Sequence, residues 1–389
     1  MFRTARTARS TRTALARPGR LPLAAVTAGL LAVALGLGGG VAGASASQTA
    51  DAAQPADAAQ PADAAQPAVD RISGADRYEA AVNISKASKP ADSPVVFLVT
   101  GENYPDALSA APAAVHLGAP LLLTTKTSVP PVVLAEIKRL APQLVVVVGG
   151  VNSVSDAAVK QVEALRYPDP VEPTQTARPT INRVAGADRY EASRNIITYA
   201  FGSTSAGFYY IATGANFPDA LSAGAAGGAA DAPVLLVNGS SATLDGPTQS
   251  FLTSRSTNLS YKIAGGPNSV SPGIENYLKS ITEEGFTTVQ RFGGADRYAA
   301  SLNINHDAFT GKAPQRVFLA TGSNFPDALA GAAFAGAVKA PLFVVHGDCV
   351  PSGILTEIAE LGAKRVTLLG GPASLNAGVA SLQSCDGPQ

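Results

Sequence analysis

The chain has 389 residues, 46 % of them apolar, and carries 29 basic and 29 acidic residues. Because non-specific nucleic-acid binding depends on a strongly basic surface, this balance excludes it, and we expect no nucleic-acid partner. The two cysteines and three histidines do not stand at metal-ligand spacing, so we expect neither a metal nor another cofactor.

Residues 1–46 are predicted to be a secretory signal peptide. Six arginines precede an apolar stretch that begins at Leu21, and residues 44–46 offer a cleavage site of the A-x-A type. A membrane anchor or an organelle transit peptide stays an alternative, since the apolar stretch is nearly long enough to span a bilayer. Loss of the leader leaves 23 basic against 29 acidic residues. An anionic partner of this mildly acidic protein must therefore be met by local positive sites.

Residues 47–68 are predicted to be a disordered tether. They contain three successive copies of Asp-Ala-Ala-Gln-Pro-Ala, beginning at Asp51. This composition has no large apolar side chain that could be buried in a core, so we expect a semi-extended linker.

Three motifs then recur with a period close to the size of a small domain. Gly-Ala-Asp-Arg-Tyr begins at Gly74, Gly186 and Gly294, at spacings of 112 and 108 residues. Each copy is followed by Asn-aromatic-Pro-Asp-Ala-Leu and later by a Gly-Gly pair behind an apolar run. The predicted modules are residues 69–167, 181–285 and 286–387. A Pro-rich linker, residues 168–180, is predicted between the first and the second.

Within each module, short apolar runs alternate with helical segments. Residues 145–148 are four valines without polar alternation, which is typical of a strand buried on both faces of a parallel sheet. A further short strand is expected before each Gly-Ala-Asp-Arg-Tyr. The pattern predicts an α/β fold of three tandem, Rossmann-like, parallel-sheet modules with right-handed crossovers.

The segment behind each Asn-aromatic-Pro-Asp is rich in small residues, at 107–114, 220–230 and 328–337. Small side chains let a helix approach its neighbour closely. Tight packing on the module's own sheet would explain them, and so would contact between modules. We favour contact between modules, which predicts a compact pseudo-threefold arrangement: a monomer with an internal pseudo-trimer and no membrane-spanning segment after the leader.

Most of Gly-Ala-Asp-Arg-Tyr is explained as a helix start. Asp76 stands three residues before Glu79, as in a capping box, and Asp188 repeats the pattern, whereas the third module has Ala299 in place of the Glu. The arginine is not explained in this way, because the positive end of the helix dipole opposes a cation there by about 0.3–1 kcal/mol.

A second arginine stands six residues before each of these. The pairs form either internal salt bridges or a site for carboxylate or phosphate groups, which a guanidinium fork binds well. The six candidate ligand-binding arginines are Arg71 and Arg77, Arg183 and Arg189, and Arg291 and Arg297.

The Asn-aromatic-Pro-Asp segment also has two interpretations. The Asn could cap the following helix, with Pro in its first turn. Because the segment follows a buried strand, it also lies at the carboxyl edge of the sheet, where open α/β folds bind ligands. The candidate ligand-binding residues are Asn103 and Asp106, Asn216 and Asp219, and Asn324 and Asp327.

Cys349 and Cys385 are a candidate disulfide that would tie the C-terminal tail to a strand end in an exported chain. For catalysis, the sequence has no G-x-S-x-G, no H-E-x-x-H, and no His or Cys shared by the three modules. We therefore expect a binding protein without catalytic residues.

Together these motifs resemble the cell wall-binding repeat type 2 family. The matching segments of the first module are residues 71–81, 101–109, 120–125 and 148–155. The resemblance implies α/β modules in a pseudo-trimer, held non-covalently to anionic polymers of the Gram-positive wall, either teichoic-acid-like polymers or related polysaccharides. The family's Leu-Leu-Thr strand end is clear only in the first module, since residues 235–238 and 343–346 depart from it.

We therefore expect an exported surface protein, associated with the cell wall and without catalysis. Family members usually pair the triplet with another domain, whereas here a leader and a tether are all that accompany it. A sorting signal of the L-P-x-T-G kind is missing, so we expect non-covalent retention. The alternatives are a secreted hydrolase or transferase acting on wall glycopolymers, and a purely structural surface protein.

Overall fold

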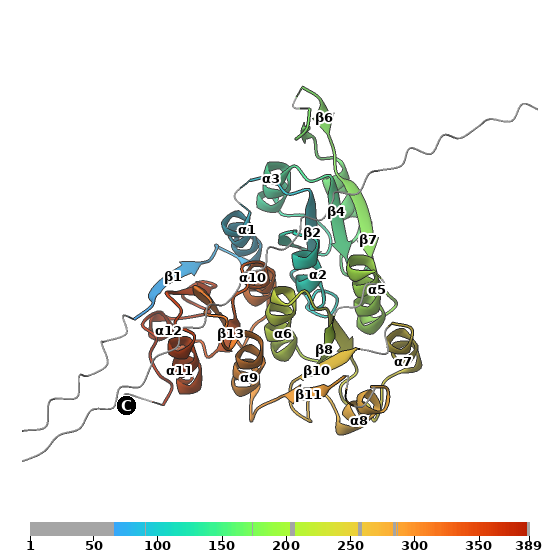
Figure 1. Ribbon diagram of the computed structural model, residues 1–389. Coiled ribbons are helices and arrows are strands. Elements are labelled where there is room, and N and C mark those ends of the chain that lie inside the picture. Colours follow the sequence, from blue (N-terminus) through green and yellow to red (C-terminus); the bar gives the residue numbers. More distant parts are fainter. Residues whose placement is uncertain are drawn as a thin grey trace, which may run out of the picture. The chain divides into compact units, whose positions relative to one another are not determined.

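The computed structural model describes residues 66–386 except 90, 173, 203–206, 256–258, 283–284 and 286 (Figure 1). The predicted signal peptide and all but the last residues of the predicted tether lie outside the described residues. Among the helices described, none is both long and apolar enough to cross a bilayer.

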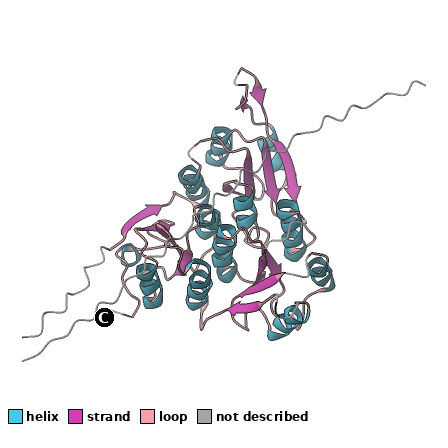
Figure 2. Ribbon diagram, in the orientation of Figure 1, coloured by secondary structure: helices cyan, strands magenta, loops and turns pink. Residues whose placement is uncertain are grey.

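Three four-stranded parallel sheets carry the fold (Figure 2). The first sheet has the order β3-β2-β4-β7, from Leu121–Thr124, Val95–Thr100, Leu144–Val148 and Thr180–Val184. The second has the order β11-β10-β8-β9, from Val289–Phe292, Ser260–Ala264, Phe208–Thr213 and Val234–Val237. The third has the order β1-β14-β12-β13, from Ala68–Ile72, Arg365–Leu369, Arg316–Thr321 and Leu342–Val345. A small antiparallel pair, β5 (Tyr167–Pro168) and β6 (Thr176–Ala177), lies in the predicted linker.

The first and second sheets are each completed by the strand that precedes the next Gly-Ala-Asp-Arg-Tyr. Strand β7 pairs with β4 of the first repeat, and β11 pairs with β10 of the second. The short strand predicted before each Gly-Ala-Asp-Arg-Tyr is confirmed as β1, β7 and β11, but β7 and β11 belong to the sheet of the preceding repeat and not, as predicted, to the module of their own repeat. After the last helix of a repeat, the chain returns to the sheet of that same repeat and adds this strand in parallel, as in any β-α-β unit. The chain changes sheet between this strand and the helix after it.

The third sheet has no following repeat, and β1 completes it. Residues 68–72 pair in parallel with residues 365–369, from Ala68 opposite Arg365 to Ile72 opposite Leu369. Asp70 forms ion pairs with Arg365 (3.1 Å) and, at 3.9 Å, with Arg316. The first and last strands that the structure describes therefore close the arrangement of three sheets.

The helices fall into equivalent sets in the three repeats. Those beginning at the motif arginine are α1 (Arg77–Ser88), α5 (Arg189–Phe201) and α9 (Arg297–Phe309), and each packs on the sheet of its own repeat. The outer helices are α3 (Pro131–Leu140), α4 (Asp156–Glu163), α7 (Gly246–Thr253), α8 (Pro272–Ser280), α11 (Ser352–Glu360) and α12 (Ala377–Ala380).

The small-residue helices pack against one another in pairs: α2 (Ala110–His116), α6 (Pro218–Ala229) and α10 (Pro326–Ala337). A Cβ atom added to Gly228 would lie 2.9 Å from the Val115 side chain and 3.3 Å from the Cα of Gly336. Only small side chains permit this approach between helices of three different repeats. The predicted pseudo-threefold arrangement is thus confirmed, and contact between modules explains the composition.

The aromatic residues of the three Asn-aromatic-Pro-Asp segments meet in one cluster. The Tyr104 ring lies 5.5 Å from those of Phe217 and Phe325, and these two lie 6.0 Å apart. Edge contacts at such distances stabilise aromatic pairs beyond the area they bury. The aromatic position of the motif therefore serves the contact between repeats.

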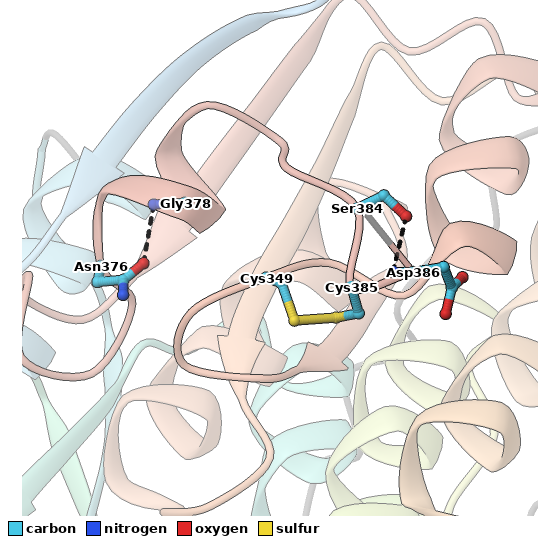
Figure 3. The surroundings of a disulfide bond; sticks show 6 residues. All are labelled: Cys349, Asn376, Gly378, Ser384, Cys385 and Asp386. Atoms are coloured by element: carbon cyan, nitrogen blue, oxygen red, sulfur yellow. Dashed lines mark hydrogen bonds between the residues drawn. A yellow bond between two sulfur atoms is a disulfide. The ribbon is translucent and has the colours of Figure 1, made fainter. Parts of the chain in front are cut away.

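The C-terminal tail is fastened beside the loop behind β13. Cys349 and Cys385 are joined by a disulfide across 36 residues of sequence (Figure 3). Val350 donates its N–H to the Gln383 carbonyl (2.8 Å), and its own carbonyl accepts from Cys385 (3.0 Å). This tail follows α12, which has only four residues, whereas its counterparts α4 and α8 have eight and nine.

Candidate functional site

The helix-start interpretation of Gly-Ala-Asp-Arg-Tyr is confirmed. In each repeat the Asp side chain accepts two backbone N–H groups of the first turn at 2.8–2.9 Å. Glu79 and Glu191 reach back to the N–H of the residue before the cap. A Cβ atom on Gly74 would lie 2.3 Å from the backbone N of Ala80, so the close approach of the turn to its helix requires glycine.

The earlier arginine of each pair braces the Gly-Gly turn of the sheet that its strand completes. Nη1 of Arg71, Arg183 and Arg291 donates to the carbonyl oxygen of Gly370, Gly149 and Gly265, at 2.6, 2.8 and 3.0 Å. Further bonds run from Arg71 to the Leu375 carbonyl, from Arg183 to Val154 and Asp156, and from Arg291 to Glu275. Each of these three guanidinium groups thus makes at least two hydrogen bonds within the protein.

The later arginine of each pair makes a single hydrogen bond. Nη1 of Arg77 donates to the Gly101 carbonyl (2.5 Å) and that of Arg189 to Gly214 (2.6 Å), and Arg297 bonds Gly322 in the same way. Within the described residues, none of the three has an ion pair. All three are half-buried. Within the part of the chain that the structure describes, their remaining N–H groups have no hydrogen-bond partner.

The Asp of Asn-aromatic-Pro-Asp holds the Gly-Gly turn from the other side. Asp106 Oδ2 accepts from the Ser153 hydroxyl at 2.5 Å. Burial raises the pKa of Asp219, against a hydrogen bond from Ser269 and the field of Arg297. Burial likewise raises the pKa of Asp327, which Arg77 and Ser374 lower.

The first glycine of each turn has a positive φ, 108° at Gly149, 107° at Gly265 and 112° at Gly370. A Cβ atom there would fall 2.3–2.9 Å from the Asp carboxylate of the same repeat. The Ser that bonds this Asp is a site residue that the sequence analysis missed. The signal was present, because Gly-Gly-x-x-Ser recurs in all three repeats.

The interpretation of the Asn as a helix cap is wrong. Asn103, Asn216 and Asn324 each accept, through Oδ1, the N–H of the aromatic residue directly after them. The helices begin later, at Pro218 and Pro326, without a side-chain cap, and in the first repeat only at Ala110. The three Asn side chains remain exposed at the carboxyl edges of the sheets.

Each candidate site is assembled from two repeats. A cavity of about 210 Å³ is lined by Asn103, Asp106 and Ser153 of the first repeat and by Asp188 and Arg189 of the second. A second cavity, of about 200 Å³, is lined by the corresponding residues Asn216, Asp219, Ser269, Asp296 and Arg297. At the third junction Arg77 acts on Asp327. This combination follows from the change of sheet, which brings the Arg of one repeat to the Asp of the repeat before it.

The sequence profile of the family described as Cell wall binding domain 2 (CWB2) matches residues 71–159, 183–275 and 291–380. The chain belongs to the CWB2 family. Each matched CWB2 segment begins at the arginine that braces a Gly-Gly turn, and together the segments contain every candidate ligand-binding residue. Membership in CWB2 assigns the three repeats to cell-wall binding.

Known proteins with CWB2-like sequence or structure support this assignment. The chain is 28 % identical over 318 residues to N-acetylmuramoyl-L-alanine amidase LytC of Bacillus subtilis (strain 168), covering 80 % of this chain and 57 % of LytC. It is 28 % identical over 311 residues to the Amidase enhancer of the same organism, covering 80 % and 39 %. Among solved structures it resembles Cwp6 from Clostridium difficile, with a TM-score of 0.70 and 28 % identity over 83 % of this chain and 49 % of that one.

The chain therefore spans about half the length of the relatives it matches. Cwp8 from Clostridium difficile, at 24 % identity and a TM-score of 0.68, adds support for the fold alone. The amidase activity in the name of LytC is a property of that protein. The match to this chain leaves 43 % of LytC uncovered.

Proposed function

We propose that the protein is exported and held non-covalently to anionic polymers of the cell wall, without catalysis of its own. Teichoic-acid-like polymers or related polysaccharides are the ligands. The supporting observation is the later arginine of each repeat. It stands at the first helical position, against the helix dipole, and among the described residues one of its N–H groups has a hydrogen-bond partner.

Such a guanidinium group suits a phosphate or carboxylate. Its planar fork of donors can bond two oxygen atoms of the anion at once. It lies at the carboxyl edge of a parallel sheet, beside an exposed Asn side chain with its own amide donors. Two junctions share this arrangement with the same residue types, and at the third Arg77 lies close enough to Asp327 to lower its pKa against the effect of burial.

The carboxylates in each cavity limit the affinity of a single site. Asp188 and Asp106 flank Arg189, and both already accept hydrogen bonds, from the first turn of α5 and from Ser153. Since the cavity holds two acidic side chains and one basic one, an anion is bound weakly there. Three weak sites on one protein bind a long polymer tightly, because the second and third contacts form at high effective concentration.

Retention on purified walls tests this proposal. The triple variant Arg77→Gln, Arg189→Gln, Arg297→Gln is compared with the charge-matched control Lys160→Gln, Lys312→Gln, Lys339→Gln, which changes exposed lysines. We expect the arginine variant to lose retention, by about tenfold per site, since a lost hydrogen bond to a charged group costs about 1.5–3 kcal/mol. The control should bind like the wild type, and both variants should keep their thermal melting curves.

Walls stripped of anionic polymers provide the second arm. The wild type should no longer be retained on them. Equal retention before and after stripping would show that the ligand is not an anionic polymer.

One observation favours the alternative of a wall hydrolase or transferase. Asp219 and Asp327 are carboxyl groups with a raised pKa beside a cavity, which is common for catalytic acids and bases. Turnover of wall polymer by the wild type, abolished by Asp106→Asn together with Asp219→Asn and Asp327→Asn, would establish catalysis. We expect no turnover, because each Asp already has a structural role at its Gly-Gly turn.

A further inference from the structure

We propose that the second repeat has an additional pocket for a neutral sugar residue, a hexose or an N-acetylhexosamine. The cavity lies between the start of α5 and the loop that joins β9 to α7, and it measures about 330 Å³. This volume lies at the lower end of the range for small-molecule sites. Its lining includes Asp188, Tyr190, Arg194, Asn238, Thr243 and Asp245.

The second repeat differs from the other two at this place. Its loop runs from the end of β9 at Val237 to the helix cap Asp245, and it is two residues longer than the loops before the caps Pro130 and Pro351. Four residues after the motif Tyr, the second repeat has Arg194, whereas the others have Val82 and Leu302. A longer loop and a polar side chain thus replace a shorter loop and an apolar one.

The third repeat fills the corresponding space with a ring of its own. The His346 imidazole lies on Tyr298, with 3.8 Å between the ring centroids and 33° between the planes. Tyr298 is the counterpart of Tyr190, and His346 directly follows β13 as Asn238 directly follows β9. With Asn238 in place of the imidazole, Tyr190 lines an open cavity and offers an aromatic surface on which a sugar ring can pack.

The charges in this pocket favour a neutral ligand. Arg194 is 13 % exposed, donates to the Thr248 hydroxyl (2.7 Å) and pairs with Asp245 at 3.5 Å. Asp245 caps α7 by accepting the Thr248 N–H, and Asp188 caps α5. The cation is therefore already balanced, and the second carboxylate repels phosphates and carboxylates. Carboxylate acceptors together with amide and hydroxyl groups suit the hydroxyl groups of a sugar.

The pocket would also affect which polymer is bound. Asp188 lines both this pocket and the cavity of Arg189, so the two lie side by side. A polymer could place an anionic group at Arg189 and the neighbouring neutral sugar against Tyr190. This link to the polymer rests on the proposed function, whereas binding of a free sugar does not.

Saturation-transfer NMR with free sugars tests the pocket. The panel contains glucose, galactose, N-acetylglucosamine and N-acetylgalactosamine, with glucuronate and glucose 6-phosphate as charged counterparts. We expect at least one neutral sugar to bind with a dissociation constant on the order of millimolar, as befits one residue of a polymer. The variant Asn238→His gives the second repeat the residue of the third, and it should weaken this binding about tenfold or more.

The matched control is His346→Asn, which changes the third repeat and should leave sugar binding in the second at least as strong as in the wild type. Thr243→Trp fills the same pocket from its exposed loop and serves if Asn238→His does not fold. The proposal is overturned if no neutral sugar binds, if only the charged sugars bind, or if the folded Asn238→His and Thr243→Trp variants bind as the wild type does. The triple arginine variant separates the two proposals. If it keeps both wall retention and sugar binding, the proposed anion sites are refuted and the sugar pocket is not.

Discussion

Arg71 and Arg77 are six residues apart in sequence and serve different sheets. Arg71 lies on β1, the edge strand that completes the third sheet, and bonds the carbonyl of Gly370 in the Gly-Gly turn of that sheet. Arg77 starts the first helix of the next repeat and bonds Gly101 behind the first strand there. The same division holds in the other two repeats. At the scale of residues, the earlier arginines stabilise the fold, and the later ones retain the donors available to a ligand.

The glycines of the Gly-Gly turn give a prediction at this scale. Gly149→Ala should lower the free energy of unfolding by about 1–3 kcal/mol, because φ is positive there and the new methyl group would lie 2.9 Å from the Asp106 carboxylate. Gly150→Ala is the matched control. A Cβ atom there would meet nothing within 4 Å, so we expect a change below about 0.5 kcal/mol. Urea unfolding of both variants measures the difference, and equal effects would contradict the role given to Asp106.

Between elements, the first and third repeats use different cations to neutralise a buried glutamate. Glu357 of α11 is 4 % exposed and bonds His306 of α9 at 2.7 Å. Glu136 of α3 is 2 % exposed and is held by Arg139 and by Ser85 of α1. The His306–Glu357 pair joins α9 to α11, whereas Arg139 lies on α3 itself and Ser85 makes the link from α1 to Glu136. Of the two cations, only the histidine titrates near neutral pH.

This difference predicts a dependence on pH. The hydrogen bond to Glu357 raises the pKa of His306 above its ordinary value. The stability from this pair is thus fully present below about pH 6.5 and is lost as the pH rises through the raised folded pKa. The melting-temperature gap between wild type and His306→Gln should shrink from about pH 5.5 to about pH 8.5. For Arg139→Gln the gap should stay constant, and parallel pH profiles of the two variants would refute the assignment.

Much of this element structure is predictable from the sequence. Continuous apolar runs such as residues 145–148 identify buried parallel strands, and the Asp caps give the starts of α1, α5 and α9. The runs do not indicate which sheet a strand joins. The pairing of β7 and β11 with the sheet of the preceding repeat was therefore not predictable from them, and neither were the sites that combine residues of two repeats. The Asn cap is wrong for a local reason. The Asn103 side chain accepts the backbone N–H of Tyr104 and not one from the first turn of the helix. The helix begins only after Tyr104, whose ring packs in the aromatic cluster between the repeats.

At the scale of the whole molecule, β1 is the element that closes the arrangement. Without it, β14 becomes an unpaired edge, and the Gly370 turn loses its bonds from Arg71. We expect deletion of residues 66–72 to lower the melting temperature and to speed amide hydrogen exchange in residues 365–369. A peptide of residues 66–74, added in trans, should slow that exchange again. Deletion of residues 51–65 is the control, and if it has the same effect on exchange, β1 has no special role.

Closure by β1 also concerns the order in which the chain is made. Ala68 leaves the ribosome 297 residues before its partner Arg365. At 5–20 residues per second, roughly 15–60 s of synthesis separate the two. Strands β4 and β10 are made before β14. Until β7 and β11 pair with them, each has a free edge to which β1 could bind. Those strands begin with Leu144 and Ser260, whereas β14 begins with Arg365, to which Asp70 pairs. Exposed ion pairs add little stability, so we expect Asp70 to affect the choice of partner strand more than the free energy of unfolding: its carboxylate meets a cation at the start of β14 and an uncharged residue at the starts of β4 and β10.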